Sequence, residues 1–141
     1  MRLYLDASLL IAVLINEARG EDVAAWMDAN ANEDHVSSLW VEAEFSAALS
    51  IKARSGALSE EGRQAALDYF RRIRAESLTL LPIEDEHFHR AARLADRSDP
   101  GLRAGDALHL AIASGHGAKI CTLDRRLAAA GPPIGVETEI V

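Results

Sequence analysis

The sequence is poor in cysteine, with Cys121 alone among its 141 residues. A disulfide needs two cysteines, and a thiolate zinc cluster needs several. The composition therefore excludes an intrachain disulfide and a thiolate zinc cluster. Cys121 lies within Lys119–Leu123, a short apolar segment. We therefore expect it to be a small buried hydrophobic residue rather than a reactive thiol.

Long hydrophobic runs are also lacking. The longest, Ala7–Ile15, is far shorter than the roughly 20 residues that cross a bilayer. Asp6 precedes this run and the charged segment Asn16–Gly20 follows it, unlike the basic start and small-residue cleavage site of a signal peptide. We expect a cytoplasmic protein with no membrane segment.

Basic side chains are outnumbered, with 15 Lys and Arg residues against 22 Asp and Glu residues and a formal net charge of −7. This balance argues against a protein that binds nucleic acid through a generally basic surface. Bound divalent cations would offset the negative charge where a phosphate approaches. An acidic surface would also suit a basic partner segment.

The remaining composition is that of a globular protein, with 49% hydrophobic and 26% charged residues and no visible repeat or linker. The length is close to the commonest domain size, which predicts one domain over residues 1–141. Short apolar segments alternate with longer amphipathic ones, and this alternation predicts an α/β fold with a parallel sheet covered by helices on both faces. The strands are expected at 2–5, 35–37, 78–81, 119–122 and, at one edge, 136–138.

The predicted helices are bounded by polar residues and glycines. Ser8 is the expected cap of a first helix ending at Leu14, and Ser38 is expected to open a long helix ending near Arg54. The other helices are expected at 21–31, from 59 onward, and at 84–97, 103–114 and 124–129. In such folds the functional site lies beyond the carboxyl ends of the strands.

Two aspartates fall at these strand ends. Asp6 directly follows the first strand, and Asp124 comes two residues after Thr122 at the end of another. Each alone is also a plausible helix cap.

Two further acids lie on apolar helix faces. Glu44 shares its face with residues such as Val41 and Ala48, and Asp106 shares its face with Leu110. A carboxylate in such surroundings is costly unless a positive group pairs with it. The ordinary explanations for Glu44 are an ion pair with a buried arginine or a place at the rim of the core.

Together, four converging carboxylates repel one another and require a cation. Oxygen ligands without cysteine or a histidine pair favour Mg²⁺ or Mn²⁺ over zinc. Phosphodiester hydrolysis is the natural chemistry of such a site. The sequence therefore predicts a magnesium- or manganese-dependent enzyme.

The order and spacing of the motifs resemble those of PIN-domain nucleases, of the VapC type found as the toxin in bacterial toxin–antitoxin pairs. The resemblance spans essentially the whole chain and is carried by Tyr4–Ser8, Ser37–Phe45, Leu102–Ala111 and Thr122–Leu127. It implies a PIN-like three-layer α/β/α fold with a central parallel sheet of about five strands. It also implies a Mg²⁺- or Mn²⁺-dependent endoribonuclease that cuts RNA and forms a homodimer.

The same resemblance assigns Asp6, Glu44, Asp106 and Asp124 to the catalytic, metal-binding site. Ser8 and Thr122, by position, would support it through hydrogen bonds to the carboxylates or to metal-bound water. A cognate antitoxin would block the site with its C-terminal segment, inserting a basic side chain among the acids.

Three assignments rest on local context. Glu44 has more apolar surroundings than Glu42, which stays open as the alternative second acid. Arg103 and Arg125, each close in sequence to a site acid, are the candidate RNA contacts. His109 follows Asp106 by three residues and is interpreted as a packed or hydrogen-bonded histidine rather than a ligand.

Two other functions compete with the ribonuclease. A Mg²⁺-dependent phosphatase would use Asp6 as nucleophile, but that chemistry usually has a second acid two residues on, where Ser8 stands here, and a lysine in the site. The other is a non-catalytic PIN-like or receiver-like binding module, whose acids hold a structural cation.

Overall fold

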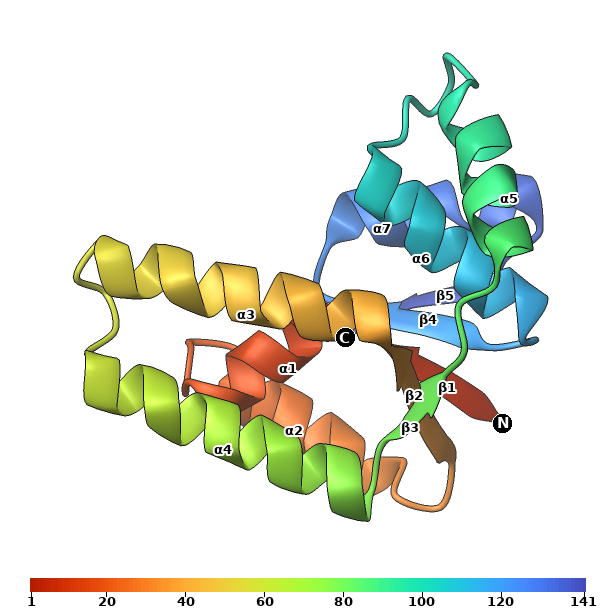
Figure 1. The fold of residues 1–141 in the computed structure, drawn as a ribbon. Helices are drawn as coiled ribbons and strands as arrows, with labels where there is room; N and C mark the ends of the chain where they lie inside the picture. Colours follow the sequence, from red (N-terminus) through yellow and green to blue (C-terminus); the bar gives the residue numbers. More distant parts are fainter.

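A computed structural model describes residues 1–141, with five strands between two groups of helices (Figure 1). The strands are β1 (Arg2–Leu5), β2 (Asp34–Ser38), β3 (Thr79–Leu81), β4 (Lys119–Thr122) and β5 (Thr138–Ile140). The helices are α1 (Ala7–Leu14), α2 (Gly20–Ala29), α3 (Leu39–Arg54), α4 (Glu60–Glu76), α5 (Asp85–Ala95), α6 (Ala104–Gly115) and α7 (Arg125–Ala130), with a short 3₁₀ helix at Pro132–Ile134.

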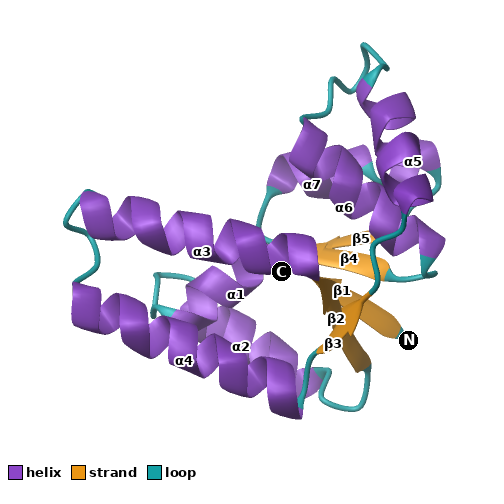
Figure 2. Cartoon of the chain, in the orientation of Figure 1, coloured by secondary structure: helices purple, strands orange, loops and turns teal.

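The strands form one sheet in the order β3-β2-β1-β4-β5, and every neighbouring pair is parallel. Figure 2 shows the sheet between α1–α4 on one side and α5–α7 on the other. The predicted α/β class and five-stranded parallel sheet are confirmed. Because all strands run the same way, the ends of β1 and β4 lie at the same edge, which brings Asp6 and Asp124 towards each other.

The core is one continuous cluster of 30 buried hydrophobic residues that draws on the sheet and on helices of both groups. Cys121 is fully buried in it, and burial raises the pKa of its thiol to about 12, so the thiol stays protonated and inert. None of the helices has both the length and the apolar character needed to cross a bilayer.

The start of α1 differs from the prediction. Asp6, not Ser8, is the N-cap, and its side chain accepts a hydrogen bond from the Leu9 N–H. Ser8 lies in the first helical turn and its hydroxyl donates to Asp6. Asp6 directly follows β1 and has an extended backbone conformation. The N-cap position requires this conformation, so Asp6 caps the helix.

Several other boundaries shift by one or two residues, and two of these shifts have a visible cause. Helix α2 ends at Ala29, because the Asn30 side chain donates to the Trp26 carbonyl and closes the helix there. The edge strand β5 begins at Thr138, two residues later than expected, because the Val136 N–H bonds to Gly131 in the preceding turn.

Candidate active site

Asp6 lies at the centre of a hydrogen-bonded junction between β1 and β4. Its side chain is buried, and the hydroxyls of Ser8 and Thr122 donate to its two carboxylate oxygens over 2.6 and 2.5 Å. Burial raises the pKa of Asp6, and the bonds from Ser8 and Thr122 counteract part of that rise. The carboxylate is therefore held in one orientation at the edge of the sheet.

The same two hydroxyls tie this carboxylate to the segment after β4. Thr122 Oγ1 accepts from the Asp124 N–H at 2.9 Å, and Ser8 Oγ accepts from the Leu123 N–H at 2.9 Å. Asp124 is exposed and is the N-cap of α7, accepting from the Arg126 and Leu127 N–H groups. Both strand-end aspartates are thus helix caps, and Thr122 links the carboxylate of one to the backbone of the other.

Asp106 joins this group from the first turn of α6. Its side chain is half-buried, and its pKa is raised by burial first and then by the negative charges of Asp124 and Glu44. Negative charges that raise the pKa of a neighbouring carboxyl group in this way form a concentration of negative charge that a cation would relieve.

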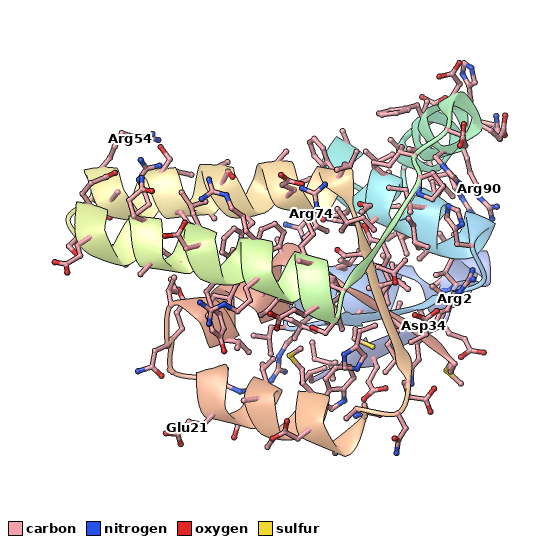
Figure 3. All side chains as sticks on the ribbon, turned by 60° about the horizontal axis from the view of Figure 1, so that its bottom comes forward. Arg2, Glu21, Asp34, Arg54, Arg74 and Arg90 are labelled. Atoms are coloured by element: carbon pink, nitrogen blue, oxygen red, sulfur yellow. The ribbon has the colours of Figure 1, made fainter.

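The two glutamates of α3 point to different places. Glu42 forms an ion pair at 2.8 Å with Arg74 of α4, which is labelled in Figure 3. Glu44 faces α6, where its Oε1 lies 2.5 Å from His109 Nε2. The structure therefore places Glu44, and not Glu42, beside Asp106.

Helices α3 and α6 pack against each other at Gly105. A Cβ atom built on Gly105 would lie 3.5 Å from the Trp40 ring and 3.7 Å from Glu44 Oε2, both ordinary contact distances. Since Gly105 directly precedes Asp106, the Glu44 carboxylate lies against the backbone that carries the neighbouring acid.

The prediction that His109 is a packed or hydrogen-bonded histidine is confirmed, but its partners were not evident from the sequence. The histidine is 2% exposed and hydrogen-bonded on both ring nitrogens, to Glu44 and to the Tyr4 hydroxyl, which in turn contacts Ser38. A tyrosine within a buried strand was the available signal, because a buried hydroxyl needs a partner.

The donor set fits a hard cation by its chemistry, since all four candidate ligands are carboxylates. No three carboxylate, imidazole or thiol groups lie close enough together, as the side chains stand, to ligate a single ion. Mg²⁺ is commonly held by only one or two carboxylates with water completing its coordination, so this arrangement remains compatible with a hydrated ion.

The surroundings of the acids are open and partly basic. Arg103, the N-cap residue of α6, is exposed, and its charge lowers the pKa of Asp106, opposing the larger effects of burial and the neighbouring acids. Arg125 is exposed at the start of α7, next to Asp124. The cavity of about 560 Å³ beside α5 is lined by none of the four acids.

Comparison with known proteins gives one family match and several similar structures. The sequence matches the PIN domain family over residues 3–131. Curated protein sequences gave no significant match.

Similar solved structures come from bacterial complexes and toxins. VapBC2 of Rickettsia felis, bound to a DNA fragment from its promoter, superimposes with a TM-score of 0.73 at 17% identity, over 99% of this chain and 98% of the other. The sarcin-ricin loop cleaving toxin VapC20 of Mycobacterium tuberculosis has a TM-score of 0.71 at 18% identity, over 92% and 95%. FitAcB of Neisseria gonorrhoeae has a TM-score of 0.68 at 19% identity, over 96% and 95%.

Proposed function

The chain belongs to the PIN domain family, and on that basis we propose that it is a metal-dependent endoribonuclease that hydrolyses phosphodiester bonds in RNA. The observation that supports the proposal is the surroundings of Asp106, whose pKa is raised by burial and by the negative charges of Asp124 and Glu44, from two other parts of the chain. Asp6 is linked to the same segment because Thr122 donates to its carboxylate and accepts from the Asp124 N–H.

In this proposal the four carboxylates hold Mg²⁺ or Mn²⁺. When bound, the ion polarises the phosphoryl oxygen and lowers the pKa of a water molecule. Ser8 and Thr122 fix the rotamer of Asp6 through their hydrogen bonds, so that the carboxylate needs no rearrangement to act as a ligand.

The exposed guanidinium groups of Arg103 and Arg125 flank the acids and are proposed to contact RNA phosphates. They offer local positive charge in a molecule whose net charge is −7.

The proposal extends to a partner. The similar structures include complexes named VapBC and FitAB, in which the names denote toxin–antitoxin pairs. We infer that this chain is the toxin of such a pair, a cytoplasmic homodimer inhibited by a cognate antitoxin that presents a basic side chain to the acids.

The competing phosphatase is disfavoured by the placement of the lysines. Lys52 is paired with Glu17 and Lys119 with Glu139, so neither is available to a phosphate beside Asp6. Ser8 also occupies the position where such enzymes usually have their second acid.

Incubation of the purified, partner-free chain with total cellular RNA tests the proposal. Discrete fragments are expected with Mn²⁺ or Mg²⁺ but not with EDTA, and not with the Asp106→Asn variant. The matched control is Asp28→Asn, which changes an exposed aspartate on α2 and should cleave as the wild type does. Intact RNA, with protein that is folded and binds the metal, would contradict the general ribonuclease and favour a binding module.

A further inference from the structure

A chain of hydrogen bonds runs from Glu44 into the core, through three residues that the proposed chemistry does not use. His109 Nε2 is 2.5 Å from Glu44 Oε1, and His109 Nδ1 is 3.0 Å from the Tyr4 hydroxyl oxygen. That oxygen is 2.7 Å from Ser38 Oγ. The four residues come from α3, α6, β1 and the end of β2, so the chain crosses four elements beneath the candidate site.

We propose that Tyr4 and His109 are positioning residues that hold the Glu44 carboxylate in one orientation through this relay, and thereby set the affinity of the site for its divalent ion. The inference rests on the proposed function, because it gives Glu44 its role. We define the relay as Ser38, Tyr4, His109 and Glu44.

The direction of the relay follows from the donors and acceptors available. An ionised Glu44 can only accept, so His109 donates from Nε2. A neutral imidazole with its hydrogen on Nε2 accepts at Nδ1 from Tyr4, and Ser38 then donates to the tyrosine oxygen. Burial raises the pKa of Tyr4, which keeps its hydroxyl protonated as a donor.

The position of Ser38 supports this role of the relay independently. It occupies the N-cap of α3, where a serine side chain ordinarily accepts from a helix N–H. Its side chain makes no such capping bond and instead contacts Tyr4. The helix thus forgoes a common stabilising contact, and the hydroxyl anchors the far end of the relay.

Burial protects the relay from competing water. Tyr4 and Ser38 are fully buried and His109 is 2% exposed, whereas the Glu44 side chain remains 31% exposed. The relay engages Oε1 of Glu44, while Oε2 lies 3.7 Å from the position of a Cβ on Gly105, the residue before Asp106. One carboxylate oxygen is therefore held by the relay, and the other takes no part in it.

Mn²⁺ titration of the full chain, followed by the electron paramagnetic resonance signal of the free ion, tests this inference at 25 °C. Hydrogen-bond partners of metal ligands typically change metal affinity about 10–100-fold when removed. We expect Tyr4→Phe to raise the Kd for Mn²⁺ about tenfold. His109→Gln, which keeps an N–H donor for Glu44, should raise the Kd less than His109→Leu does.

The matched controls are Tyr69→Phe and His89→Gln, which alter an exposed tyrosine on α4 and an exposed histidine on α5. Both should bind Mn²⁺ as the wild type does. Circular dichroism verifies that each variant is folded at 25 °C, and Ser38→Ala, which removes the last donor of the relay, replaces Tyr4→Phe if that variant does not fold.

A double-mutant comparison separates positioning from a general loss of stability. In a Glu44→Gln background, Tyr4→Phe should cause no further change in the Kd, because the relay acts through Glu44. A folded Tyr4→Phe protein with the wild-type Kd, or an equal change in both backgrounds, would overturn the inference while leaving the ribonuclease intact. A wild type that neither binds Mn²⁺ nor cleaves RNA would overturn both.

Discussion

At the scale of single residues, two glutamates on one helix have opposite surroundings. Glu42 is paired with Arg74 at the surface, and Glu44 contacts buried His109. Side chains two positions apart on a helix point in different directions, so only one of them can face the acids.

We therefore expect Glu44→Gln to lower the rate of RNA cleavage at least about 100-fold. Glu42→Gln should retain the wild-type rate and cost no more than about 1 kcal/mol of stability, because exposed ion pairs contribute little. Parallel cleavage assays and urea unfolding measure both effects. A loss of cleavage in Glu42→Gln alone would reverse the assignment.

Asp106 gives a prediction with a defined pH dependence. Its pKa in the folded protein is raised above the ordinary 3.8 by burial and by Asp124 and Glu44. The carboxyl therefore favours folding fully below about pH 3.8, and that contribution is lost as the pH rises through the raised pKa. Ionised Asp106 thus weakens the metal-free fold at neutral pH.

Asp106→Asn should consequently raise the Tm of the metal-free protein by about 1–3 °C at pH 7.5, while abolishing metal-dependent cleavage. Calorimetry in EDTA measures the shift, and it should vanish below about pH 4, where the wild-type carboxyl is protonated as well. The affinity for Mn²⁺ should decrease as the pH is lowered through the same raised pKa of Asp106. A lower Tm for the variant at pH 7.5 would show that the charge stabilises the fold.

The sequence located the acids at this scale but not their contacts. Asp6 and Asp124 could be identified because an aspartate after a buried strand is visible in the pattern. How the two segments meet depends on Ser8 and Thr122, because Thr122 donates to Asp6 and Ser8 accepts from the Leu123 N–H, across more than 100 residues. Such pairings depend on tertiary packing, which the sequence pattern does not reveal.

At the scale of elements, helix packing requires glycine at the start of α2 but not at the start of α6. A Cβ on Gly20, at the start of α2, would lie 2.5 Å from the Ala12 carbonyl oxygen of α1. A backbone atom cannot move aside cheaply, so α1 and α2 can pack this closely only without a side chain there. Gly105 has ordinary contact distances instead.

Gly20→Ala is therefore expected to destabilise the protein by about 1–3 kcal/mol through overpacking. Gly105→Ala should raise stability by up to about 1 kcal/mol, because alanine favours the helix, and should preserve cleavage. Urea unfolding of the metal-free proteins compares them. Equal effects of the two substitutions would contradict this account of helix packing.

The accuracy of the predicted elements followed the strength of the burial pattern. Strands β1 and β4 begin and end where the sequence indicated, because both are apolar segments buried on two faces. The edge strand β5 begins two residues later than predicted. Its residues are only partly buried, so the sequence shows no continuous apolar segment there. The hydrogen bond from the Val136 N–H to the Gly131 carbonyl keeps Val136 in the turn before the strand. Helix ends depended on which side chain caps them.

At the scale of the whole molecule, a net charge of −7 and four converging acids predict that a divalent ion stabilises the fold. A ligand present at 100 times its Kd stabilises the native state by about 2.7 kcal/mol, which corresponds to a rise in Tm of about 5–10 °C. Calorimetry with Mn²⁺ measures this shift. NaCl at matched ionic strength is the control, and an equal shift in NaCl would mean that only general charge screening is involved.

The fold class and the family followed from features spread over the whole chain, namely the alternation of strands and helices and the order of the four acids. The identity of the RNA did not, because RNA recognition depends on the shape of loops and exposed side chains around the site.

Diffraction from crystals grown with Mn²⁺, recorded at the manganese absorption edge, tests the central claim most directly. The account predicts an anomalous peak in direct contact with at least two of Asp6, Glu44, Asp106 and Asp124. A peak elsewhere, or none among these carboxylates at saturating Mn²⁺, would contradict the claim that they form the metal site of a ribonuclease.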